Sequence, residues 1–112
     1  MRVFLKVCSV AVIAFLVYVH LGPAKWQPPR TGLGWQMDHF LGYVAATSIV
    51  WLAWPQSFVV GPALMAAAVL LEALQAFTPD RHADFQAGLF GAAGALTVAV
   101  LAELFVRVKR QR

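Results

Sequence analysis

Residues 39–71 read HFLGYVAATSIVWLAWPQSFVVGPALMAAAVLL, a run of 33 residues without a formal charge that decides the fold. As a single helix this run would be about 50 Å long, far more than the roughly 30 Å hydrocarbon core of a bilayer. Pro55 lies near its middle, where it disfavours helix at the preceding residue and lacks an amide donor. The run therefore predicts two membrane spans, over about 38–54 and 58–77, that fold back at the WPQS sequence of 54–57.

Two further apolar runs flank this stretch. Eighteen residues without a formal charge separate Lys6 from Lys25, and another 18 separate Asp84 from Glu103, enough for one span each. The chain is 61% hydrophobic and 12% charged, which is too apolar for a soluble domain of 112 residues. We therefore expect one all-α domain over residues 1–112, a polytopic membrane protein built as a four-transmembrane-helix bundle. Its spans are expected at about 3–21, 38–54, 58–77 and 85–107.

The basic residues flank the spans instead of forming a patch. Six lie on the side of the termini and the 54–57 turn: Arg2, Lys6, Arg107, Lys109, Arg110 and Arg112. Three lie on the other side: Lys25, Arg30 and Arg81. This excess predicts an inner-membrane protein with both termini in the cytoplasm. It favours contact with membrane lipids and no nucleic-acid partner. Because no clear cleavage site follows the first apolar run, we expect that run to be an uncleaved span.

Small residues recur at the start of the last span. Gly88 lies four residues before Ala92, and Gly91 lies four residues before Ala95. Small residues at this spacing let two helix backbones approach closely. We expect helix packing by Gly88, Gly91 and Gly94.

Polar residues gather near one membrane face. Glu72 ends the central run, and a carboxylate in a membrane segment costs at least about 3 kcal/mol and normally has a partner. Gln75 shares its helical face, while His39 begins the preceding span, with Tyr43 one turn later. Convergence at the extracytoplasmic end is expected for His39, Glu72, Gln75, Arg81 and Asp84.

Two interpretations of these residues stay open. In the functional one, Glu72 is a catalytic acid or base with His39 as its proton partner. The ligand-binding residues are then Arg81, Asp84, Gln75 and Tyr43. In the structural one, Glu72 pairs with Arg81 or hydrogen-bonds Gln75 to fix helix packing. Helix N-caps are then expected at Asp38 and Asp84, and His20 lies at the membrane interface.

Known cofactor and metal signatures are missing from the sequence. No H-x-x-x-H or H-E-x-x-H spacing occurs, and no nucleotide-binding fingerprint is present, so we expect neither a metal nor another cofactor. Glu103 and Arg107, four residues apart, are expected to form a structural pair.

The order of these motifs resembles the VanZ-like family of small bacterial integral membrane proteins. The resemblance covers about residues 35–100 and rests on the patterns His39-Phe40-x-x-Tyr43, Glu72-x-x-Gln75 and Pro79-x-Arg81, followed by an Asp and a glycine-rich helix. By position, the resemblance implies that Gly91 and Gly94 match the family's glycine-rich helix. It also implies that the family's polar signature is matched by His39, Tyr43, Glu72, Gln75, Arg81 and Asp84. The chain departs from the family at Trp35 and Gln36, where an Asp-Lys pair is common, and at Gly88, where an Asn is common.

The resemblance implies a place in the cell envelope, because the family is named for low-level resistance to the glycopeptide teicoplanin. The family's general biochemical activity is not established. We therefore expect the polar cluster to bind or modify an anionic envelope lipid or a lipid-linked cell-wall precursor. A non-catalytic scaffold or partner-binding module is the alternative, and a proton-coupled small transporter is the third. Whether the protein is an enzyme, and whether it forms homo-oligomers, stays open.

Overall fold

The computed structural model describes residues 2–22, 32–78 and 84–111, and every regular element within these ranges is helical. The all-α prediction is therefore confirmed. The helices are α1 (Arg2–Leu21), α2 (Trp35–Ala53), α3 (Ser57–Leu74) and α4 (Phe85–Arg110), and a 3₁₀ turn, η2 (Gln75–Phe77), extends α3. Their bounds differ from the predicted spans by no more than three residues.

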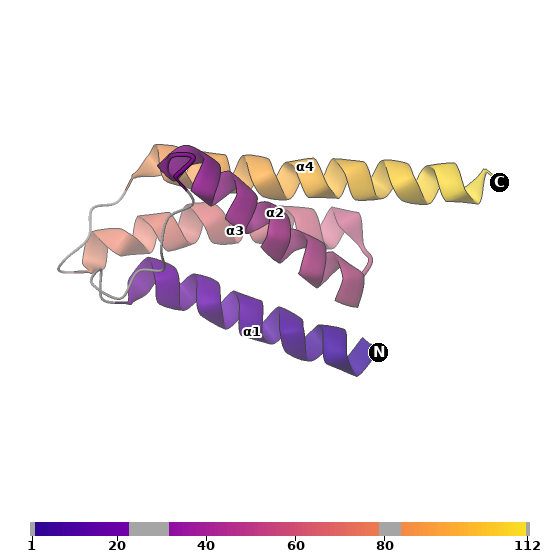
Figure 1. The fold of residues 1–112 in the computed structure, drawn as a ribbon, viewed down its shortest axis with the longest axis horizontal. Helices are drawn as coiled ribbons and strands as arrows, with labels where there is room; N and C mark the ends of the chain where they lie inside the picture. The colour runs from indigo at the N-terminus through magenta and orange to yellow at the C-terminus, as the bar shows by residue number, and fades with distance from the viewer. Residues whose placement is uncertain (1, 23–31, 79–83, 112) are drawn as a thin grey trace.

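Three of these helices are long and apolar enough to cross a membrane: α1, α3 with η2, and α4. Helix α2 is not one of the three, and its N-terminal part carries the polar residues Gln36, Asp38 and His39. It nevertheless packs against all three other helices, while α4 lies mainly along α2 and α3 (Figure 1). A multi-pass membrane protein is thus supported, and the crossing of α2 stays a prediction.

The start of α2 differs from the expected one. The N-cap is Gly34, not Asp38, and its φ of 105° lies in the left-handed region that favours glycine. The Asp38 N–H donates to the Gly34 carbonyl over 3.0 Å, which places Asp38 inside the first turn. The N-cap prediction for Asp38 was wrong because Gly34 allows the helix to begin before it. A carboxylate in the first turn still interacts favourably with the helix dipole.

The fold-back between α2 and α3 lies at the expected place. Helix α2 ends at Ala53, the backbone of its C-cap Trp54 leaves the helical region, and α3 begins after Pro55 and Gln56. The Trp51 indole then donates to the Ser57 hydroxyl over 3.1 Å, joining the two helix ends.

The glycines of α4 lie where the helices approach most closely. A Cβ atom at Gly91 would lie 2.7 Å from the Tyr43 ring and 3.0 Å from the Ala68 methyl group. At Gly94 it would collide with the Phe40 carbonyl. These positions therefore let α4 pack directly on α2 and α3.

The two ends of the bundle differ in character. The start of α1, the end of α4 and the turn between α2 and α3 lie at one end of the bundle, and the opposite ends of the four helices lie at the other (Figure 1). The end of α1, the start of α2, the end of α3 and the start of α4 thus share the second end. At the first end, Arg107 Nε lies 3.1 Å from Glu103 Oε1 as the expected i,i+4 pair, and it contributes little because Arg107 is exposed.

Candidate functional site

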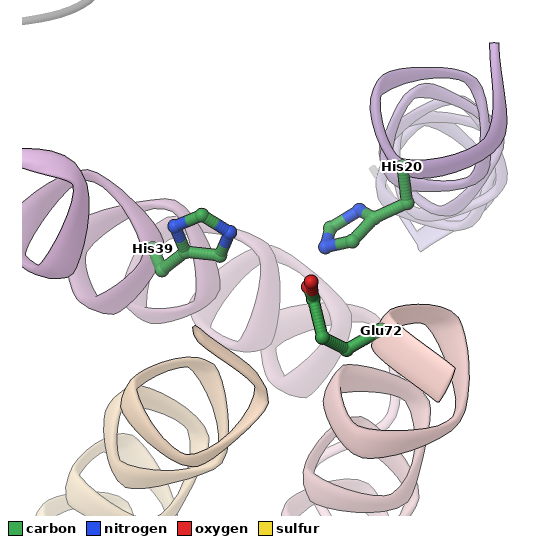
Figure 2. A group of neighbouring side chains, drawn as sticks. All are labelled: His20, His39 and Glu72. Carbon is green, nitrogen blue, oxygen red and sulfur yellow. The ribbon is translucent and has the colours of Figure 1, made fainter. Parts of the chain in front are cut away.

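Three side chains from three helices meet at the end opposite the termini. They are His20 from the last turn of α1, His39 from α2 and Glu72 from near the end of α3 (Figure 2). One nitrogen of each histidine and a carboxylate oxygen of Glu72 all lie within 4.8 Å of one another. His20 and Glu72 are each only 4% exposed, and His39 is half-buried. We call these residues the His-His-Glu cluster.

Backbone carbonyls orient both imidazoles. His20 Nδ1 lies 2.8 Å from the Leu16 carbonyl oxygen, and His39 Nδ1 lies 2.8 Å from that of Trp35. A carbonyl only accepts, so each Nδ1 must carry its hydrogen and donate it. Figure 2 shows the other nitrogen of each ring turned toward the space around the Glu72 carboxylate. The two rings meet edge to face, with centroids 6.0 Å apart.

Glu72 is held by the start of the next helix. Its Oε1 accepts the backbone N–H of Asp84 over 3.0 Å, so the carboxylate links the end of α3 to the start of α4. The Asp84 side chain is exposed and accepts the Gln86 N–H over 3.0 Å, which makes it the N-cap of α4. Asp84 therefore touches the cluster through its backbone, while its carboxylate is used for capping.

Gln75 joins α3 to α1. Its side-chain amide is buried and donates to the His20 carbonyl over 2.9 Å. Burial makes this contact valuable, because an unmade hydrogen bond in a buried position costs about 1–3 kcal/mol. Gln75 thus fixes the end of α1, from which His20 extends.

Two buried hydroxyl groups lie on α2 beyond His39. Tyr43 is 2% exposed and Thr47 is fully buried, and within the described ranges neither hydroxyl has a hydrogen-bond partner. The Tyr43 ring packs edge-on against His20, with centroids 6.0 Å apart. A polar stripe therefore continues from the cluster into the core of the bundle.

The structure brings most of the expected residues to one end. His39 and Glu72 share the cluster, Tyr43 and Gln75 contact His20, and Asp84 contacts Glu72. Arg81 lies outside the described residues, and its expected contact with Glu72 stays a prediction.

Sequence reasoning missed the part played by His20. Its position at the membrane interface stays a prediction, but its burial beside His39 and Glu72 was not expected. Metal-ligand motifs, which depend on short spacings along the chain, could not identify His20, because the three residues of the cluster come from three helices. The usable signal was topological: His20 ends its span on the side where His39 begins the next one.

Two imidazoles and a carboxylate can perform two kinds of chemistry. They form a donor set that binds zinc and related divalent ions. They can also pass a proton between a histidine and the carboxylate. Both are compatible with the burial of the cluster near the end of the bundle.

Alanine at Asp84 is expected to lower the free energy of unfolding by about 1 kcal/mol, because the Gln86 N–H loses its cap. Asparagine at the same position keeps a capping oxygen and should stay within a few tenths of a kcal/mol of wild type. Unfolding by sodium dodecyl sulfate, followed by circular dichroism in a mild detergent, measures both. Equal stability of the two variants would contradict a capping role.

Comparison of the chain with known protein families, curated proteins and solved structures gives no match. What the protein does therefore has to follow from its own residues.

Proposed function

We propose that this chain is a VanZ-like multi-pass protein of the inner membrane that binds an anionic envelope lipid or a lipid-linked cell-wall precursor. The observation that carries the proposal is the convergence of buried polar side chains at one end of an otherwise apolar bundle. Polar groups buried in a membrane protein are costly and are usually retained for function. The buried groups are His20, Tyr43, Glu72 and Gln75, and the half-buried His39 lies beside them.

The proposed site lies on the extracytoplasmic side. The six Lys and Arg residues near the termini and three in the opposite connections support cytoplasmic termini. A cysteine replacing the exposed Asp84, in a Cys8→Ala background, should react with an impermeant thiol reagent added outside intact cells. A cysteine replacing Arg110, also exposed, is the matched control and should react only after permeabilisation. The reverse pattern would place the site in the cytoplasm and end the cell-wall proposal.

The residues divide the recognition of such a ligand between them. Arg81, three residues before Asp84 in sequence, supplies a charged donor for an anionic headgroup. Gln75 and Tyr43 supply neutral polar groups. If the ligand is modified as well as bound, Glu72 is the acid or base and His39 its proton partner.

Binding is tested with the full chain and a polyprenyl phosphate, measured by native mass spectrometry in detergent, with phosphatidylcholine as the neutral competitor. We expect preferential retention of the polyprenyl phosphate and at least about tenfold weaker binding after Arg81→Ala or His39→Ala, since a hydrogen bond to a charged group is worth about 1.5–3 kcal/mol. Glu103→Gln changes a carboxylate at the far end of the bundle and should bind as wild type. Equal retention by all variants would refute the proposed site.

A non-catalytic module is the second candidate, and one observation favours it. Glu72 and Gln75 both bond backbone groups of neighbouring helices, as expected of residues that lock helix packing. In this case Glu72→Gln keeps function where Glu72→Ala loses stability, because the amide still accepts a hydrogen bond. An enzyme that uses the carboxylate loses activity in both variants.

A further inference from the structure

We propose that His20, His39 and Glu72 bind a divalent transition-metal ion, with zinc as the ion that best fits the donors. This goes beyond lipid binding and does not depend on it, since a metal can bind with no lipid ligand present. Three features support the site: the convergence of the donor atoms, the orientation of both histidines and the backbone contact that holds the Glu72 carboxylate.

The donor atoms are close enough to share one ion. In a tetrahedral zinc site with bonds of about 2.0–2.1 Å, neighbouring ligand atoms lie roughly 3.3 Å apart. The three atoms of the cluster lie within 4.8 Å of one another. Side-chain rotations that bring them together by at most roughly 1.5 Å would complete the coordination. Each donor lies on a different helix, within five residues of its end, so the three side chains can bind one ion while the helices keep their backbone structure.

Both histidines are oriented as metal ligands usually are. A ligating histidine typically donates its second ring N–H to a carboxylate or backbone carbonyl, which fixes the tautomer. Here Nδ1 of His20 donates to Leu16 and Nδ1 of His39 donates to Trp35. In the neutral rings each Nε2 therefore carries a lone pair, and Figure 2 shows these nitrogens turned toward the carboxylate. A bound cation is the species that three convergent lone-pair donors favour.

The carboxylate of Glu72 is the third ligand. It is 4% exposed and lies beside the two imidazoles, and a carboxylate oxygen is a ligand that zinc accepts. One divalent ion would bind this oxygen and both imidazoles at the same time. The Asp84 N–H on Oε1 holds the carboxylate in place, as outer contacts do for metal ligands.

Tyr43 marks the side on which a fourth ligand would bind. Its ring packs on His20, and its buried hydroxyl has no hydrogen-bond partner among the described residues. Three protein ligands leave one zinc position for water or a substrate oxygen. A water in that position would give the Tyr43 hydroxyl a partner.

The donor set selects among metals. Two imidazoles suit zinc, iron, copper and nickel, whereas magnesium and calcium prefer oxygen ligands. We therefore expect zinc to bind and millimolar magnesium not to displace it. The rival arrangement is a protonated histidine paired with the Glu72 carboxylate, which would hold the same residues together without a metal.

The test uses the full Cys8→Ala chain, so that no thiol binds the metal, purified in detergent through a tag without histidines. We expect one zinc per chain after titration against a competing chelator, with micromolar or tighter affinity. Cobalt at the same site should give the intense visible absorption of tetrahedral coordination, in contrast to the pale octahedral aqua ion. Absence of stoichiometric zinc binding would overturn the proposal and favour the protonated pair.

Variants locate the ion. Zinc affinity should fall at least tenfold in His20→Ala, His39→Ala and Glu72→Gln, and stay unchanged in Glu103→Gln, the matched carboxylate control. Helicity by circular dichroism verifies that each variant is folded, and zinc should raise the unfolding midpoint of the parent chain but not of Glu72→Gln. Unchanged affinity in the three cluster variants would place the ion elsewhere and refute the site. Because no lipid is added, failure of lipid binding leaves this result intact.

Discussion

Alanine at Gly94 is expected to lower the free energy of unfolding by about 2–3 kcal/mol, whereas alanine at Gly42 should raise it by about 0.5–1 kcal/mol. The same substitution thus has opposite signs at two helical glycines. The difference comes from what an added methyl group would meet.

At Gly94 the methyl group has no room. It would collide with the Phe40 carbonyl and lie 3.3 Å from the Tyr43 Cβ atom, so α2 and α4 would have to separate. Backbone atoms cannot rotate away as a flexible side chain can, and overpacking of this kind typically costs about 1–3 kcal/mol. At Gly42 nothing lies within 4 Å, so alanine only brings its better helix propensity.

Unfolding of the two variants by sodium dodecyl sulfate in mild-detergent micelles measures the effect. Ala93→Val on α4 is the control for added volume. Because Ala93 is exposed beside Gly94, this variant should be about as stable as wild type. Absence of destabilisation in Gly94→Ala would show that α2 and α4 do not pack through this face, and destabilisation by Gly42→Ala would show that the space around Gly42 is not open.

Truncation of Tyr43 to alanine should cost about 3–5 kcal/mol, the range for large aromatic residues in a packed interior. Tyr43 is the largest fully buried side chain in the described part of the chain. Its ring contacts His20 and lies against the glycine face at Gly91. The cavity left by alanine would remove contacts with α1 and α4 together.

Phenylalanine at position 43 distinguishes the contribution of the ring to stability from that of the hydroxyl group. The hydroxyl has no hydrogen-bond partner within the described ranges, so Tyr43→Phe should stay within about 1 kcal/mol of wild type in the metal-free protein. Both variants are compared by the same unfolding measurement in the presence of a chelator. A loss in Tyr43→Phe as large as in Tyr43→Ala would mean that the hydroxyl, not the packing of the ring, stabilises the core.

The helices could be predicted from the sequence because their signals are local. The signals are the runs without charge, Pro55 and the small residues of the last span, and all of them can be read directly from the sequence. The start of α2 could not be predicted as well, since it depends on the positive φ of Gly34. Propensity favours Asp38 as a cap, but the backbone conformation of Gly34, four residues earlier, decides where the helix begins.

The cluster was only partly predictable because it is a tertiary feature. The placement of His39 and Glu72 at one end follows from the order of the spans alone. The burial of His20 depends on how α1 packs on α2, and on the contact of Gln75 with the His20 carbonyl. Such interhelical geometry has no counterpart in the spacing of a single sequence.

The length of α4 has a consequence for the depth of the cluster in a bilayer. Its C-terminal end extends beyond the other helices and carries Arg107, Lys109 and Arg110 (Figure 1). Gly88, which lies against Glu72, precedes Arg107 by roughly 28 Å of helix at 1.5 Å per residue. This is close to the thickness of a hydrocarbon core of about 30 Å. In a bilayer that α4 crosses with Arg107 among the headgroups of one leaflet, the cluster would lie level with the headgroups of the other, where water and polar solutes arrive without crossing the membrane.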